Sequence, residues 1–220
     1  MHITTTATHP GGSVLASLRA LAPAHPMTLD EALRLAERQA NRLLELQDGV
    51  VVPVPTSIVT DQPRITVEHD PDLPAHAASG CSDWDRHRRT WVISLNPTEP
   101  RRRRRFTVLH EYKHILDHPS PGIRPGRYAY QRPVAEIIAD YFAGCVLIPK
   151  RLLAAAYYDG IQRPDDLAQL FDVSQEAIQV RLAQIGLGEP LLTGRHPRAT
   201  PMRAARYYRS AESHLLEVAA

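Results

Sequence analysis

The stretch FTVLHEYKHILDH, residues 106–118, sets the interpretation of the fold, because it places His110 and His114 four residues apart with Glu111 directly after the first. On a helix with about 100° per residue, both imidazoles share one face. Tyr112 lies on the opposite face among apolar neighbours (Val108, Leu109, Ile115 and Leu116). This H-E-x-x-H pattern is typical of two metal ligands with a carboxylate that reaches a water molecule. The alternative is a polar stripe on an ordinary helix.

A metal that catalyses hydrolysis needs a third protein ligand and one open position. His118 is a poor candidate, since each four-residue step climbs about 6 Å along a helix and three such histidines cannot reach one ion. We expect it at the helix end, near the last carbonyls. In AEIIADYFAGCVLIP, residues 135–149, Glu136 and Asp140 share one helix face. Glu136 is the candidate ligand and Asp140 an acceptor for a histidine N–H. The alternative is a pair of surface acids.

Composition narrows the class of protein. The chain has 220 residues, a net charge of +2 and two cysteines, Cys81 and Cys145, far apart in sequence. That spacing argues against a disulfide framework or a thiolate zinc site, and it fits a reducing compartment. No run of 18 apolar residues and no signal peptide occurs, so we expect a cytoplasmic protein without membrane contact.

The order of predicted elements indicates an α+β fold, with a small sheet followed by a mainly helical part. A helix begins at Thr28 and stops at Gly49, after a flexible start. Two or three short strands follow, from VVVPVP, RITVEH and TWVISLN, whereas DPDLPAHAASGCSDWDRH, residues 70–87, is expected to be a loop. The predicted later helices span residues 101–118, 134–147, 151–158, 165–171 and 174–185.

The combination of RRFTVLHEYKHILDH and EIIADYFAGCVLIP resembles the ImmA/IrrE-type zinc metallo-endopeptidases, which are gluzincin-like. That family shares an R-F-T-x-x-H-E-x-x-H-x-x-x-H helix and a later E-x-x-A-[ND]-x-F-A…P helix, and the likeness covers roughly residues 28–187. The resemblance implies a zincin-type fold with Zn²⁺ on His110, His114 and Glu136. It also implies that Glu111 is the catalytic base and that Asp140 lies beside the ligands.

On this basis the chain divides into four parts. Residues 1–27 form a flexible N-terminal segment, residues 28–150 a zincin-like metallopeptidase domain, residues 151–190 a helix-turn-helix-like subdomain and residues 191–220 a basic tail. Tyr112 and Lys113 replace the common Leu-Gly of the motif. Because an ammonium near a dication is repelled, we expect Lys113 to point outward, toward Asp117.

Two further predictions concern substrate binding. The strand Trp91–Leu95 could hold an extended peptide by edge pairing. Candidates for stabilising an oxyanion are named by residue type alone: Tyr128, Tyr130 and His196.

The basic residues suggest partners only weakly. The segment at residues 164–187 is typical of a helix-turn-helix, but its second helix offers only Arg181 against Glu176, so packing or partner docking is favoured over DNA binding. Arg101 to Arg105 and the tail are expected on a solvated surface, with attraction of an acidic substrate as the alternative.

The leading hypothesis is a zinc endopeptidase whose implied substrate is a helix-turn-helix repressor. The rival hypothesis is a non-catalytic anti-repressor or DNA-associated regulator with a structural or vestigial metal site. A third is a zincin that acts on another amide. The complete set of His110, Glu111, His114 and Glu136 favours catalysis, because a structural site needs no general base.

Overall fold

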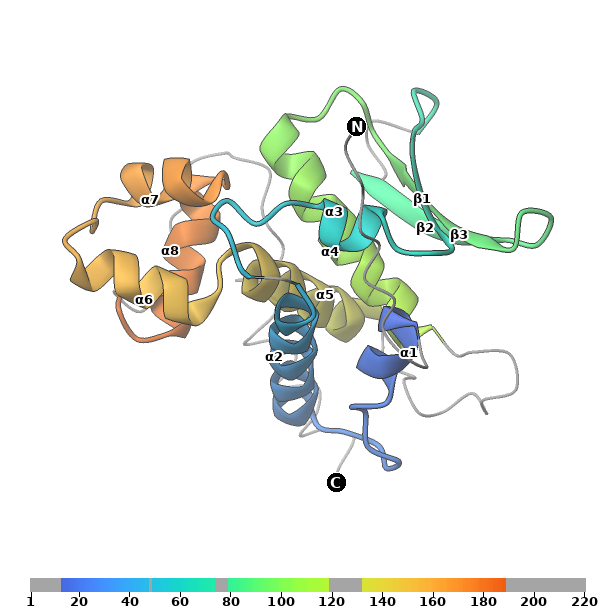
Figure 1. Ribbon diagram of the computed structural model, residues 1–220, viewed down its shortest axis with the longest axis horizontal. Coiled ribbons are helices and arrows are strands. Elements are labelled where there is room, and N and C mark those ends of the chain that lie inside the picture. Colours follow the sequence, from blue (N-terminus) through green and yellow to red (C-terminus); the bar gives the residue numbers. More distant parts are fainter. Residues whose placement is uncertain (1–12, 48, 74–78, 119–131, 189–220) are drawn as a thin grey trace, which may run out of the picture.

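The computed structural model describes residues 13–47, 49–73, 79–118 and 132–188. It has the expected α+β architecture, with a small sheet and helices around one core (Figure 1). The elements are α1 (Val14–Arg19), α2 (Leu29–Glu45), α3 (Ser57–Thr60), β1 (Ile65–His69), β2 (Gly80–Asp85), β3 (Thr90–Leu95), α4 (Arg101–Asp117), α5 (Arg132–Leu147), α6 (Lys150–Tyr158), α7 (Pro164–Phe171) and α8 (Gln175–Gln184).

The helix α2 begins where the sequence predicts, at a capping box. The Thr28 hydroxyl accepts from the Glu31 N–H at 3.3 Å, and the Glu31 carboxylate accepts from the Thr28 N–H at 2.8 Å. These two bonds satisfy backbone donors that a helix start leaves unpaired. The buried side of α2, with Leu35 and Leu43, faces α5 in the core.

The helix α1 lies in the segment expected to be flexible, so that expectation does not hold for the described residues from Ser13 onward. Leu18 is fully buried, and its carbonyl accepts from the Gln39 amide at 3.1 Å. Arg19 donates to the carbonyls of Ile115 and Leu116 at the end of α4. A long-range cap of this kind leaves no periodic signal in the sequence, which explains why α1 was missed.

The sheet has the order β1-β3-β2, with β1 parallel and β2 antiparallel to the central β3. The stretch VVVPVP forms no strand, and its prolines lack the N–H groups that a ladder requires. Conversely, β2 lies in the predicted loop. Its sequence GCSDWD lacks apolar alternation because it is an edge strand with mostly half-exposed or exposed side chains.

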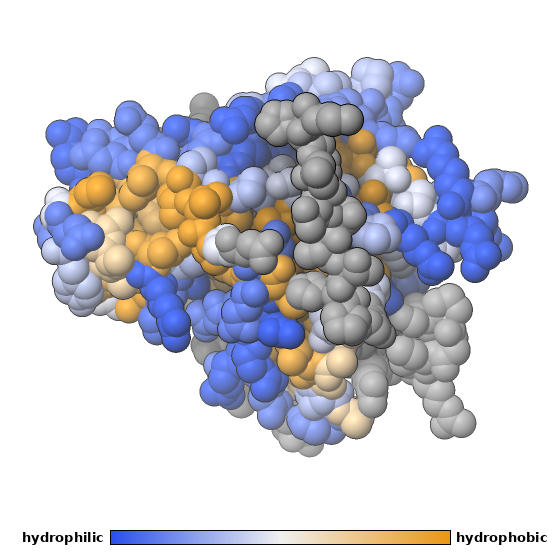
Figure 2. Space-filling model, in the orientation of Figure 1, coloured by the Kyte–Doolittle hydropathy of each residue, from blue (hydrophilic) through white to orange (hydrophobic). Residues whose placement is uncertain are grey.

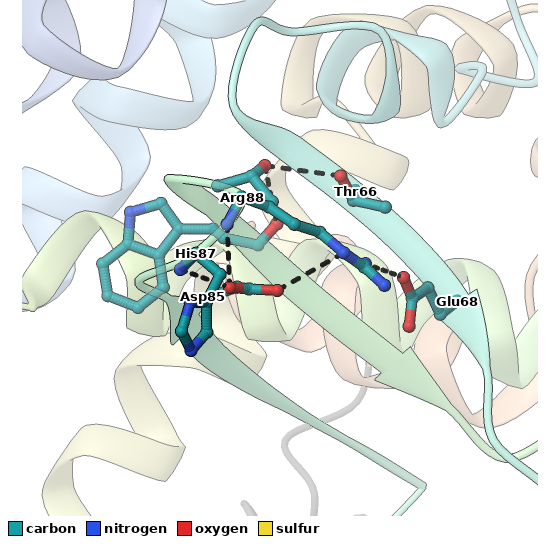
Figure 3. Close-up of polar contacts among 7 residues, drawn as sticks. Thr66, Glu68, Asp85, His87 and Arg88 are labelled. Atoms are coloured by element: carbon teal, nitrogen blue, oxygen red, sulfur yellow. Dashed lines mark hydrogen bonds and ion pairs between the residues drawn. The ribbon is translucent and has the colours of Figure 1, made fainter.

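The outer face of the sheet carries a polar network at the turn between β2 and β3 (Figure 3). The Asp85 carboxylate accepts from the backbone N–H groups of His87 and Arg88 at 2.8 and 3.0 Å, which fixes the turn. The Arg88 side chain then pairs with Asp85 and, across the sheet, with Glu68 on β1. The opposite face, with Trp91, Ile93 and Leu95 of β3 buried, packs on α4.

Arg101 to Arg105, at the start of α4, were expected on a solvated surface. The structure shows instead that several of these arginines contact other parts of the chain. Arg105 is 8% exposed and donates to the carbonyls of Val54 and Phe171 at 2.6 and 3.3 Å. It also pairs with Asp172 in the turn between α7 and α8 at 2.9 Å. Arg101 and Arg102 reach the same carboxylate. The run therefore docks the helix-turn-helix-like unit on α4.

The surface differs between the two sides of the molecule. Figure 2 shows apolar side chains gathered over the side where α6 and α7 lie, while the surface around the sheet is mainly hydrophilic. None of the described helices combines the length and the apolar character needed to cross a membrane.

Candidate metal centre

The helices α4 and α5 pack against each other and present the candidate ligands from facing sides. On α4, Tyr112 is fully buried and its hydroxyl donates to the Gln62 side chain at 2.9 Å. Its ring lies 6.3 Å from that of Phe142 on α5. This anchored apolar face turns the opposite face of α4, with His110 and His114, toward Glu136.

The side chains of His110, His114 and Glu136 converge on one point. Nε2 of His110 lies 3.0 Å from Nε2 of His114 and 3.3 Å from Oε2 of Glu136. Nε2 of His114 lies 3.6 Å from Oε1 of Glu136. Tetrahedral zinc with bonds of about 2.0–2.1 Å separates its ligand atoms by roughly 3.3–3.4 Å, which these distances bracket. The three residues form a group that could hold a metal ion.

Asp140 orients His110 from the side away from the other ligands. Its Oδ1 lies 2.8 Å from Nδ1 of His110, so the imidazole can donate there and keep the Nε2 lone pair for a metal. Burial lowers the pKa of His110, but hydrogen bonds to Asp140 and Glu136 outweigh burial and raise it to about 10. The same negative surroundings that favour a proton on His110 favour a bound cation.

The pKa of His114 is shifted in the opposite direction to that of His110. Burial, followed by the charge of His110, lowers the pKa of His114. The two imidazoles therefore resist carrying two protons at once, and His114 keeps a lone pair available. A pair of nitrogen donors beside a carboxylate is a ligand set that suits zinc.

Glu111 lies on α4 next to the histidines and is 8% exposed. Its Oε2 accepts a hydrogen bond from the Ser82 hydroxyl on β2 at 2.9 Å. Ser82 was not singled out from the sequence, because it falls in the predicted loop and its partner is far away in the chain. No sequence pattern signals this contact.

Lys113 departs from the prediction. Its side chain does not point outward but is 1% exposed, although it does pair with Asp117 as expected. The ammonium group also donates to the Gln39 side chain at 3.0 Å. Burial is tolerated because a carboxylate and an amide oxygen, one from another helix, accept from the ammonium.

His118 lies at the end of α4, as predicted, and outside the ligand group. Its backbone N–H bonds the carbonyls of His114 and Ile115, and its ring packs against Trp91 with centroids 4.9 Å apart. The candidates for oxyanion stabilisation, Tyr128, Tyr130 and His196, lie outside the described residues, as does the basic tail, residues 191–220.

The helix-turn-helix-like unit does not expose the cation on which DNA binding would depend. The Arg181 side chain is 3% exposed and contacts Glu37 on α2 at 3.3 Å and the Ile148 carbonyl at 3.2 Å. Its guanidinium also lies over the Tyr141 ring, 5.5 Å from the centroid. These contacts agree with the favoured packing role of α8.

Fold and site together describe an α+β protein in which two histidines and a glutamate form a group that could hold a metal ion. The family model Peptidase_M78, described as an IrrE N-terminal-like domain, matches residues 69–183, and the chain belongs to this family. The matched residues include the whole candidate centre and most of α8.

A solved structure described as a Mycobacterium tuberculosis transcriptional regulator is similar to this chain at 17% sequence identity and a TM-score of 0.44. The match covers 77% of this chain and 52% of that one, so the chain spans about half the length of the regulator. No curated protein matches the chain.

Proposed function

We propose that the protein is a zinc-dependent endopeptidase with His110, His114 and Glu136 as ligands. The observation that carries this proposal is the convergence of three side chains from two helices, whose possible ligand atoms lie 3.0–3.6 Å apart, with Glu111 adjacent on α4. Membership of a peptidase family supports it. The set of three candidate protein ligands also supports it, because a catalytic zinc site uses three and leaves the fourth position open, and the Glu136 and His114 side chains are 41% and 27% exposed.

Each residue of the centre has a distinct role in the proposed reaction. A zinc ion held by His110, His114 and Glu136 would act as a Lewis acid, which would make a water molecule more acidic and a substrate carbonyl more electrophilic. Glu111 accepts the proton of the attacking water and passes it to the leaving amine. Asp140 holds the ring of His110 in one tautomer and orientation.

The sheet offers an edge for an extended peptide, but not the edge that the sequence suggested. The prediction for Trp91–Leu95 was wrong, because β3 is the central strand and both of its sides are paired. In the described part of the chain, β2 is an edge strand that pairs only with β3. It also carries Ser82, which contacts Glu111. A substrate strand added to β2 would therefore pass beside the proposed base.

A cytoplasmic helix-turn-helix repressor is the proposed substrate, and its cleavage would be regulatory. This part of the proposal rests on the resemblance to the ImmA/IrrE-type endopeptidases. The rival, a DNA-associated regulator without catalysis, is disfavoured because Arg181 is buried. Direct binding of nucleic acid would have to use other residues.

The decisive experiment compares wild type with Glu111→Gln, using a repressor encoded beside this gene as substrate. Glu111→Gln should retain stoichiometric zinc by elemental analysis but lose cleavage by roughly 10²–10⁴-fold, as expected for a lost general base. Glu45→Gln is the matched control, because Glu45 is exposed at the end of α2. This variant should cleave the substrate as wild type does. Zinc-loaded Glu111→Gln with wild-type cleavage would show that the hydrolytic assignment is wrong.

A further inference from the structure

The strand β2 packs along α4, and the spacing of its inward-facing residues matches the spacing of the α4 residues that they contact. Gly80 and Ser82 share the sheet face that packs on α4 and are about 6.8 Å apart along the strand. Thr107 and Glu111 are one helical turn apart, a rise of about 6 Å. Gly80 faces Thr107, and Ser82 faces Glu111. Two steps along β2 therefore match one turn of α4.

This close approach depends on the glycine. A Cβ atom at position 80 would lie 2.6 Å from Cγ2 of Thr107 and 2.7 Å from the Ser94 carbonyl oxygen. The second contact is with backbone, which cannot move aside easily. Gly80 thus brings β2 near enough to α4 for the short side chain of Ser82 to reach the Glu111 carboxylate.

The geometry points to Ser82 as a positioning residue for the proposed base, an inference that rests on the proposed function. Its hydroxyl donates to Oε2 of Glu111 at 2.9 Å. Among the described residues, no other group donates to this carboxylate. Oε2 is therefore held from the sheet side, and Oε1 remains to accept a proton from water.

A neutral hydroxyl suits this role better than a charged group. A lysine or arginine in its place would stabilise a carboxylate by ion pairing and weaken it as a base. A serine fixes the orientation through one directional bond while adding no charge. The next residues along β2, Cys81 and Asp83, alternate to the other face of the sheet and cannot substitute for it.

The test uses four zinc-loaded variants: Ser82→Ala, Ser82→Thr, Glu111→Gln and the double variant Ser82→Ala/Glu111→Gln. Ser94→Ala is the matched control, because it also removes a serine hydroxyl, but from the opposite face of the sheet. The substrate is a quenched fluorescent peptide selected from a library by cleavage with wild type. Zinc content and thermal melting are measured for every variant.

Ser82→Ala should lower kcat about tenfold, as expected for loss of one hydrogen bond to a charged group, with KM and zinc content unchanged. Ser82→Thr keeps the hydroxyl and should restore most of kcat. In the Glu111→Gln background, Ser82→Ala should cause no further loss, since residues that act as a unit are not additive. A crystal structure of zinc-loaded Ser82→Ala should show the Glu111 carboxylate turned from its wild-type orientation.

Several results would overturn the inference. Wild-type kcat in Ser82→Ala, equal losses in the Ala and Thr variants, or a full additional loss in the double variant would each exclude positioning through Glu111. An unmoved carboxylate in the Ser82→Ala crystal would do the same. Failure of the proposed function is a separate result: it appears as full activity in Glu111→Gln, whatever Ser82→Ala does.

Discussion

The α4–α5 pair and the α7–α8 pair use buried or half-buried charged groups in opposite ways. Between α4 and α5, Nε2 of His110, Nε2 of His114 and the Glu136 carboxylate face one another, and each group has an electron pair that it could donate to a metal. At α7–α8, the guanidinium groups of Arg105 and Arg181 face carbonyls and carboxylates. The first arrangement brings electron-pair donors together, whereas the second pairs guanidinium groups with oxygen acceptors.

This difference separates a candidate chemical site from a structural contact between helices. Lone pairs that converge repel one another unless a proton or a metal ion lies between them, so such a cluster is suited to holding a cation. Donors that meet acceptors are satisfied without a ligand, and they fix one element to another. The comparison therefore supports the proposed metal site at α4–α5 and a docking role for the contacts at α7–α8, and substitutions can test both.

The largest expected effect is on metal binding. Glu136→Ala removes one of three proposed ligands and should lower zinc affinity on the order of a thousandfold, more than the loss of an outer partner causes. Competition with a chromophoric chelator measures it. Glu176→Ala on α8 is the control and should bind zinc as wild type does. Unchanged affinity in Glu136→Ala would mean that the convergence seen here is not a metal site.

The next largest effect is on the free energy of unfolding and concerns the contacts that dock α7 and α8 on the rest of the protein. Arg181→Met leaves Glu37, whose side chain is 31% exposed, without its cation, and it leaves the Ile148 carbonyl without a donor. We expect the free energy of unfolding to fall by about 3 kcal/mol, as for broken buried pairs. Urea denaturation measures this change.

The control for this variant is Arg163→Met, because Arg163 is 75% exposed and should not affect stability measurably. Zinc affinity should be the same in both variants. If Arg181→Met were as stable as wild type and instead lost affinity for DNA, α8 would be a DNA-reading helix rather than a docked one.

Local patterns predicted most of the helices and the candidate ligands. The capping residue Thr28 and the period of α4 act within a few residues, and the spacing of His110 and His114 is a property of one helix. Helical periodicity does not predict that α4 packs against α5. The family resemblance supplied that information. The α+β class and the family were confirmed, whereas the roles of the site residues stay predictions: His110, Glu111, His114, Glu136 and Asp140.

The missed features all depend on partners that are distant in the sequence. Lys113 is buried because Gln39 on α2 accepts from it, and Arg105 is buried because the α7–α8 turn lies beside α4. Composition alone places lysine and arginine on the surface. The strand β2 has little apolar alternation, since an edge strand needs only one contact face, and its contact face includes Gly80 and Ser82.

A smaller effect should follow from removing the partner of His110. Asp140→Ala takes away the carboxylate that lies 2.8 Å from Nδ1, so zinc affinity should fall about 10–100-fold, as for other outer partners of ligand histidines. Asp140→Asn keeps an acceptor oxygen and should lose much less. Chelator competition distinguishes them, and equal losses in the two variants would show that charge, rather than orientation of the ring, is what Asp140 provides.

The smallest effect concerns Asp172, the acid on which the Arg run converges. Asp172→Asn preserves the left-handed backbone at φ 51, which asparagine tolerates, but removes the charge that pairs with Arg105 and Arg101. Because Arg105 keeps its carbonyl partners, the free energy of unfolding should fall by only about 1 kcal/mol. The difference should shrink at high salt, which screens the exposed part of the cluster.

Asp166→Asn, at an acid that is 53% exposed on α7, is the control for Asp172→Asn and should match wild type at every salt concentration. Zinc affinity separates the two regions once more: Asp172→Asn should leave it unchanged if α7–α8 is only docked on α4. A loss of zinc affinity together with stability would instead mean that the contacts at α7–α8 transmit strain along α4 to His110, and the division between the site and these contacts would fail. An unchanged free energy of unfolding would show that carbonyl contacts, not charge pairing, hold the unit in place.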